Sequence, residues 1–137
     1  MKYDLIYLVD DFDVVNFLHR ILLRKLGLEE RAKVFTNPEE ALKDIRTHGG
    51  EDSRILILLD INMPEMSGFE FLEHMMAGSF PQNIDVIIVT SSVSESDMIL
   101  AKEYPRFVRD FVTKPLQINK LRDITKSVDG IEKSNLP

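Results

Sequence analysis

Two stretches of the chain are apolar at almost every successive position, and this pattern restricts the fold more than any other. Residues 55–59 read ILILL, and residues 84–89 read IDVIIV. A strand with one face in water alternates apolar and polar residues, whereas a strand covered by helices on both faces is apolar throughout. The two stretches therefore predict central strands of a parallel sheet in an α/β fold.

Strands and helices are expected to alternate along the whole chain. Shorter apolar runs predict further strands at residues 5–9, 33–36 and 111–113. Helix start signals precede five further segments and lie at Asp13, Asn37-Pro38, Ser67-Gly68, Ser94 and just after Pro115. Five strands alternating with five helices predict a doubly wound parallel sheet with right-handed crossovers. The alternation alone does not give the order of the strands.

Length and composition indicate a single ordinary globular domain. The 137 residues suffice for one hydrophobic core. A net charge of −6 argues against nucleic acid as a partner. No run approaches the roughly 18 apolar residues that cross a bilayer, and the chain has no cysteine. We expect a cytoplasmic protein with one domain at residues 1–128, a polar tail at 129–137 and no output domain.

Groups suited to phosphoryl chemistry follow four of the expected strands. These groups are Asp10 and Asp11 after the first strand, Asp60 after residues 55–59, Thr90 after residues 84–89 and Lys114 after the last strand. Ligands of open α/β sheets bind outside the carboxyl ends of the strands, so we expect these side chains to converge. Three neighbouring carboxylates are costly without a cation, and Mg²⁺ prefers oxygen ligands of this kind. Together, Mg²⁺ and the lysine would cancel the three negative charges.

Asp60 is the best candidate for a covalent nucleophile. Carboxylates can form aspartyl-phosphates, and Asp60 stands alone after the most hydrophobic run, which we expect to be the central strand. The metal and Lys114 would neutralise the phosphoryl oxygens, which is the usual source of catalysis in phosphoryl transfer. The hydroxyl of Thr90 could donate a hydrogen bond to one of those oxygens.

Four segments of the chain resemble the response-regulator receiver domain of two-component signalling. They are LVDD (8–11), LLDINMPEMSG (58–68), VIIVTSS (86–92) and FVTKPL (111–116). The resemblance extends over essentially the full length and is specific because the four segments occur together. It implies a flavodoxin-like sheet of five strands in the order 2-1-3-4-5.

The resemblance also assigns roles to the residues at the strand ends. It implies that Asp60 is the phosphoacceptor, that Asp11 and Asp60 bind Mg²⁺ directly and that Asp10 binds it through water. The remaining assignments are the backbone carbonyl of Asn62 as a further metal ligand, Thr90 and Lys114 as phosphoryl-binding groups, and a cis bond between Lys114 and Pro115.

Phe111 occupies the aromatic switch position of the family. In that scheme Thr90 moves toward the phosphoryl group, and the aromatic ring turns inward to fill the space. Asn62, Ser91 and Ser92 flank the site and are expected to tune the lifetime of the phosphoryl group. The implied partner is a sensor histidine kinase or a histidine phosphotransfer protein. The downstream target is unknown, and output would come by protein contact or onward phosphotransfer. We expect neither a separate turnover substrate nor binding to nucleic acid or membrane.

The first predicted helix carries more apolar side chains than packing on one side requires. One stripe consists of Val15, Leu18, Leu22 and Leu26. Three further residues, Val14, Phe17 and Ile21, widen it, and we hypothesise that they help to dock a helical phosphodonor. The alternative is that they are buried against the last helix or are simply exposed. The chain's histidines, His19, His48 and His74, lack metal-ligand spacing, and we expect them to be exposed or partly buried without a phosphoryl role.

Three other functions compete with a phosphorylated receiver. A phosphohydrolase of the haloacid-dehalogenase type requires a second Asp two residues after the nucleophile, where this chain has Asn62. A degenerate receiver that binds partners without phosphorylation is disfavoured, because no expected site residue is missing. A flavin-binding protein of the flavodoxin type would need a glycine- and hydroxyl-rich loop after the first strand, which the sequence lacks.

Overall fold

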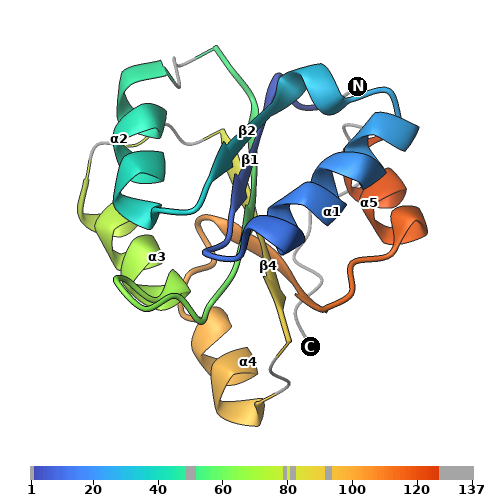
Figure 1. Cartoon of the computed structure of the whole chain (residues 1–137). Coiled ribbons are helices and arrows are strands. Elements are labelled where there is room, and N and C mark those ends of the chain that lie inside the picture. Colours follow the sequence, from blue (N-terminus) through green and yellow to red (C-terminus); the bar gives the residue numbers. More distant parts are fainter. Residues whose placement is uncertain (1, 49–51, 79, 81–82, 92–93, 127–137) are drawn as a thin grey trace.

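The chain folds into one five-stranded parallel sheet flanked by helices (Figure 1). The computed structural model describes residues 2–48, 52–78, 80, 83–91 and 94–126. The strands are β1 (Leu5–Val9), β2 (Ala32–Phe35), β3 (Ile55–Leu59), β4 (Ile84–Thr90) and β5 (Val108–Thr113). The helices are α1 (Asp13–Lys25), α2 (Pro38–His48), α3 (Gly68–Ala77), α4 (Glu95–Ala101) and α5 (Ile118–Thr125), with a 3-10 turn, η1 (Glu29–Arg31).

The sheet order is β2-β1-β3-β4-β5, which confirms the order implied by the sequence resemblance. All neighbouring strands are parallel. β3 is the middle strand, and every residue of β3 and β4 is buried, as their continuous apolar character predicted. β5 begins three residues before its predicted start, because Val108 and Asp110 also pair with β4.

Helices cover both faces of the sheet. Leu23 of α1 and Leu121 of α5 belong to one apolar cluster, whereas Ile45 of α2, Phe71 of α3 and Ala101 of α4 belong to the other. Figure 1 shows the same division, with α1 beside α5 and α2 beside α3. None of the helices in the described residues combines the length and apolar character needed to cross a membrane.

Three helix starts use the capping residues that the sequence predicted. The Asn37 side chain accepts hydrogen bonds from the first-turn N–H groups of α2. Ser67 and Glu70 form a reciprocal capping box at α3, and Ser94 accepts the N–H of Asp97 at α4. Each cap satisfies N–H groups that have no partner within the helix.

The prediction that Asp13 caps α1 is wrong. The cap position is Phe12, which has no side-chain cap bond, and Asp13 is the first helical residue. The carboxylate of Asp10 instead accepts the N–H of Phe12 at 3.0 Å. Asp13 still places a negative charge in the first turn, where the helix dipole favours it.

The predicted packing stripe of α1 is also displaced around the helix axis. The buried residues of α1 are Asn16, His19 and Leu23. Leu18, which was expected to pack, is 52% exposed, and the remaining members of the stripe are half-buried: Val15, Leu22 and Leu26. Polar side chains occupy the core-facing side because Asn16 finds hydrogen-bond acceptors there. Apolar periodicity therefore assigned the wrong face.

Candidate functional site

The parallel register brings the predicted site residues to one edge of the sheet. Val9, at the end of β1, pairs with Leu59, at the end of β3, so the acids that follow both strands become neighbours. Asp10, Asp11 and Asp60 each offer a carboxylate oxygen within 4.8 Å of the others. Asp10 and Asp60 are buried, while Asp11 is half-buried. The predicted convergence of the three acids is confirmed.

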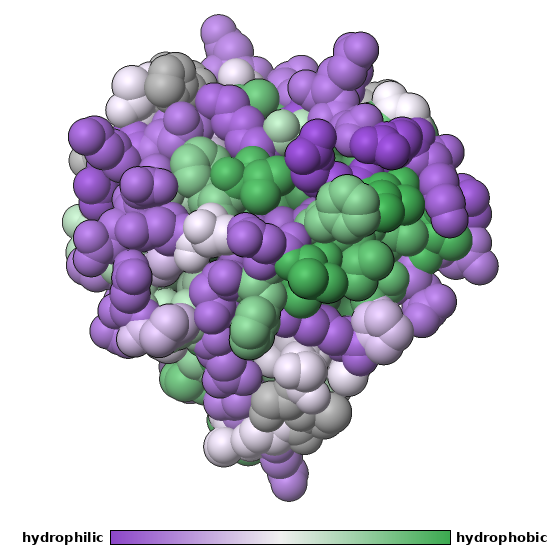
Figure 2. All heavy atoms as spheres, viewed as in Figure 1, coloured by the Kyte–Doolittle hydropathy of each residue, from purple (hydrophilic) through white to green (hydrophobic). Residues whose placement is uncertain are grey.

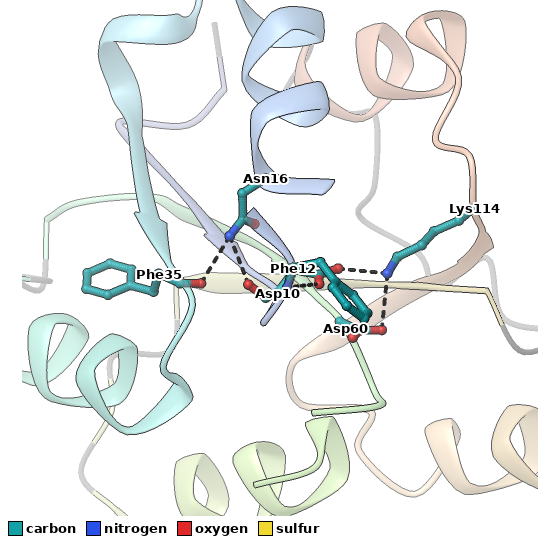
Figure 3. Close-up of polar contacts among 6 residues, drawn as sticks. All are labelled: Asp10, Phe12, Asn16, Phe35, Asp60 and Lys114. Atoms are coloured by element: carbon teal, nitrogen blue, oxygen red, sulfur yellow. Dashed lines mark hydrogen bonds and ion pairs between the residues drawn. The ribbon is translucent and has the colours of Figure 1, made fainter. Parts of the chain in front are cut away.

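Lys114 reaches this acidic cluster from the end of β5. Its Nζ lies 2.7 Å from Oδ2 of Asp10 and 3.5 Å from Oδ1 of Asp60 (Figure 3). The backbone N–H of Lys114 donates to the carbonyl of Thr90 at 2.7 Å, which ties the ends of β4 and β5 together. The Lys114-Pro115 bond is cis, as predicted.

The environment of Asp60 favours its protonated form. Burial is the main reason that the pKa of Asp60 is raised, and the negative charge of Asp10 adds to this effect. The ammonium of Lys114 and the backbone N–H of Asn62 act in the opposite direction. A nucleophilic carboxylate at this position therefore benefits from any further positive charge near it.

The three acids fit a divalent cation with oxygen ligands. Both oxygens of Asp10 already have partners, namely the N–H of Phe12 and the ammonium of Lys114. Oδ1 of Asp11 is buried and has no hydrogen-bond partner among the described residues. A polar hollow of about 460 Å³ opens on Asp11, with two further acids, Glu40 and Glu65, in its lining. A buried carboxylate oxygen without a partner among the described residues, on an acid that also lines this hollow, suits Mg²⁺, which retains several waters when bound.

Thr90 and Phe111, the predicted switch residues, lie on the neighbouring strands β4 and β5. Thr90 is fully buried at the end of β4, beside β3, the strand that precedes Asp60. Phe111 pairs with Ile88 in the register of β4 and β5 and is half-buried against the core on the side of α2, α3 and α4. Both positions follow directly from the strand order.

Of the residues predicted to tune phosphoryl lifetime, the structure describes Asn62 and Ser91. Both are exposed and lie near the start of the segments that follow β3 and β4. The backbone N–H of Asn62 is hydrogen-bonded to Asp60 and lowers the pKa of its carboxyl group. The carbonyl of Asn62 as a metal ligand stays a prediction, and Ser92 lies outside the described residues.

Two polar residues of α1 beside the site were missed by the sequence reasoning. The expectation that His19 is exposed or partly buried is wrong, because it is only 6% exposed. Burial lowers its pKa to about 4, the charge of Asp10 opposes this effect and the charge of Lys114 adds to it. Asn16 is 1% exposed and is hydrogen-bonded to the backbone of Asp10. The available signal was their spacing with Leu23 at i, i+3 and i+7, which places all three on one helix face.

An apolar groove of about 440 Å³ runs beside Lys114, between α1 and the segment before α5. Its lining includes Leu18, His19 and Ile21 of α1 together with Pro115 and Leu116.

The apolar residues at the outer side of α1 continue from this groove onto the surface. Val14 is 67% exposed and Phe17 is 57% exposed, whereas Ile21 is half-buried. Figure 2 shows the apolar side chains that gather over α1. Burial against α5 is therefore not the explanation for Val14 and Phe17.

Comparisons with known proteins agree with this fold and identify the family. A family model described as the response regulator receiver domain matches residues 6–126. The two-component response regulator 24 of Arabidopsis thaliana is 32% identical, covering 85% of this chain and 77% of the relative. The probable methanogenesis regulatory protein FilR2 of Methanothrix harundinacea is 27% identical, over 90% and 80%. A crystal structure of a two-component response regulator from Cytophaga hutchinsonii is similar with a TM-score of 0.79 and 28% identity, over 90% of this chain and 95% of that one. The chain belongs to the response regulator receiver domain family of two-component systems.

Proposed function

We propose that this protein is a phosphorylation switch in which Asp60 accepts a phosphoryl group from a phosphohistidine residue, with Mg²⁺ as the cofactor. The observation that carries the proposal is the convergence of three carboxylates and the Lys114 ammonium at the end of the central strand. The phosphoryl donor would be a sensor histidine kinase or a histidine phosphotransfer protein. The proposal keeps the sequence-based expectation of a cytoplasmic protein with no separate turnover substrate.

The chemistry assigns one task to each group. A carboxylate oxygen of Asp60 attacks phosphorus, the P–N bond of the donor breaks, and the imidazole nitrogen keeps the electron pair and takes up a proton. Lys114, 3.5 Å from Asp60, pairs with a phosphoryl oxygen. Mg²⁺, when bound, supplies charge that neutralises the phosphoryl oxygens. The groups that would hold it are the carboxylates of Asp10, Asp11 and Asp60 and the carbonyl of Asn62.

The signal would leave the site through the end of β4. The Thr90 hydroxyl would donate to the new phosphoryl group, and Phe111 would move inward and alter the surface near α4. Such a switch shifts the balance between two conformations that exist before phosphorylation. Asn62, Ser91 and Ser92 follow the site residues Asp60 and Thr90 in the sequence and would set how readily water reaches the phosphoryl group.

The decisive experiment is incubation with acetyl phosphate and Mg²⁺, followed by intact-protein mass spectrometry. The wild type should gain one phosphoryl group that is labile at alkaline pH, and Asp60→Asn should gain none. Removing Mg²⁺ with a chelator should prevent the gain. If the wild type gains nothing although it is folded, a receiver that works without phosphorylation takes the place of this proposal.

The apolar surface of α1 is the proposed docking face for the phosphodonor. Val14 and Phe17 are exposed on it, and Ile21 lines the groove that leads to Lys114. A helix of the donor that packs here would lie beside the phosphoacceptor, where its phosphohistidine must reach. Amphipathic helices commonly bind apolar grooves through side chains spaced by three and four residues.

Phe17→Ser tests the docking face. Phosphotransfer from the cognate donor protein should become roughly tenfold slower, since an exposed aromatic anchor at an interface contributes about 1–2 kcal/mol. Phosphorylation by acetyl phosphate should not change. Ile99→Ser, on α4, is the matched control, because Ile99 has the same 57% exposure as Phe17. Wild-type transfer by Phe17→Ser would exclude this docking face.

A further inference from the structure

Asn16 is a buried residue in the first turns of α1, and its side-chain amide contacts the backbone of the Asp10–Asp11 segment. It is 1% exposed. Its Nδ2 donates to the carbonyl of Asp10 at 2.9 Å and to the carbonyl of Phe35 at 3.3 Å (Figure 3). One side chain therefore joins α1 to the carboxyl ends of two neighbouring strands, β1 and β2.

The backbone of Asp10 is held from several directions as a result. Its N–H donates to the carbonyl of Phe35 at 3.2 Å, while its own carbonyl accepts from Asn16. Its carboxylate accepts the N–H of Phe12 at 3.0 Å and the ammonium of Lys114 at 2.7 Å. Of these bonds, the one from Asn16 to the carbonyl fixes the peptide that connects Asp10 to Asp11. The orientation of that peptide sets where the carboxylate of Asp11 points.

The amide of Asn16 is not explained by packing alone. Its Oδ1 is buried without a hydrogen-bond partner among the described residues, which is an unfavourable position for a polar atom. The opposite orientation would place Oδ1 against two carbonyl oxygens, so the two acceptors fix the amide as it stands. Leucine would suit both a helix interior and an apolar environment better than asparagine does. The benefit of the amide therefore lies in the two backbone carbonyls to which its Nδ2 donates.

We infer that Asn16 is a positioning residue that fixes the Asp10–Asp11 segment in the geometry required for a divalent cation. It acts through hydrogen bonds to the backbone carbonyls of Asp10 and Phe35, not through contact with the cation. Groups that orient metal ligands typically change metal affinity by tenfold to a hundredfold when they are removed. The inference rests on the proposed function, because it assumes that the acidic cluster binds Mg²⁺.

The test is a Mg²⁺ titration of Asn16→Leu in the absence of any phosphoryl donor. Isothermal titration calorimetry gives the dissociation constant, and the backbone amide signals of Asp11 and Phe12 in NMR spectra report the local response. Asn16→Leu should raise the dissociation constant about tenfold. The amide signals of Asp11 and Phe12 should also be displaced before Mg²⁺ is added.

Tyr3→Phe is the matched control for a general loss of stability. It removes a buried 2.6 Å hydrogen bond to Asp85, at the opposite edge of the sheet, and it should bind Mg²⁺ like the wild type. Asn16→Ala replaces Asn16→Leu if the latter does not fold, with the same expected loss. Wild-type affinity in a folded Asn16 variant would overturn the inference alone. Absence of Mg²⁺ binding by the wild type would overturn the proposed function as well.

Discussion

Replacing Lys114 by methionine should reveal how strongly the acidic cluster depends on its lysine. The Nζ atom lies 2.7 Å from Asp10 and 3.5 Å from Asp60, and all three side chains are at least four-fifths buried. At an effective dielectric constant near 20, each contact corresponds to roughly 5–6 kcal/mol of gross attraction. The desolvation of the ammonium, which methionine avoids, offsets much of this.

The net effect of Lys114→Met should be close to that of breaking a buried ion pair. Such losses are about 3–5 kcal/mol, because a charge is left without its partner. The lower end applies here, since Asp60 can take up a proton: its pKa is already raised by burial and by Asp10, and Lys114 is one of the groups that lower it. We therefore expect unfolding in urea without Mg²⁺ at pH 8 to show a loss of about 3 kcal/mol.

The pH dependence of this loss separates electrostatics from packing. Without the lysine, the folded-state pKa of Asp60 rises further above its ordinary 3.8. The folded variant then binds a proton that the unfolded chain does not, so its stability relative to the wild type increases as the pH falls toward 4. The difference measured at pH 8 should shrink at pH 5, and Mg²⁺ should stabilise the variant more than the wild type.

Lys33→Met provides the comparison for Lys114→Met. Its 3.0 Å pair with Asp44 is more exposed and lies outside the acidic cluster, so its loss should be smaller and independent of Mg²⁺. A loss below about 1 kcal/mol for Lys114→Met, or an equal loss at pH 8 and pH 5, would refute this reasoning.

Three further substitutions test individual structural features. Burial lowers the pKa of His19 from 6.5 to about 4. Between these pH values the unfolded chain binds a proton that the folded chain does not, so the stability of the wild type should fall by up to about 3 kcal/mol as the pH drops from 6.5 to 4. His19→Leu should abolish this fall. A Cβ at Gly68 would lie 2.5 Å from the carbonyl oxygen of Asp60, so Gly68→Ala should cost about 2 kcal/mol in urea unfolding, and a cost near zero would show that this loop adapts freely. Ser67→Ala breaks the capping box with Glu70 and should lower stability by about 1 kcal/mol without changing phosphorylation by acetyl phosphate.

The meeting of the polar residues at the strand ends could be predicted from the sequence, because it depends on which segments are strands and not on how side chains pack. A parallel sheet aligns the carboxyl ends of its strands, so Asp10, Asp60 and Lys114 had to meet once their strands were recognised. The helix caps at Ser67 and Ser94 were equally local, since each depends on a few consecutive residues. The roles of these groups in phosphorylation remain proposals.

The orientation of α1 could not be predicted from its apolar pattern. Leu18 belonged to the expected packing stripe but is exposed, while Asn16 and His19 face the core. The rotation of a helix about its axis is set by the sum of its contacts. The buried face of α1 includes Asn16, whose amide donates hydrogen bonds to the carbonyls of Asp10 and Phe35. The burial of His19 is a consequence of that rotation.

The sequence by itself determined the fold class, the meeting of acidic groups and a lysine at one sheet edge and the membership of the receiver domain family. These depend on strand-like runs and the polar residues that end them, which are local properties of the chain. Only the tertiary structure decided which face of α1 is buried, that one oxygen of Asp11 has no hydrogen-bond partner within the described part of the chain, and that Asn16 donates to the peptide between Asp10 and Asp11. Those features arise from contacts between segments distant in sequence, whose geometry is fixed only when the whole core packs.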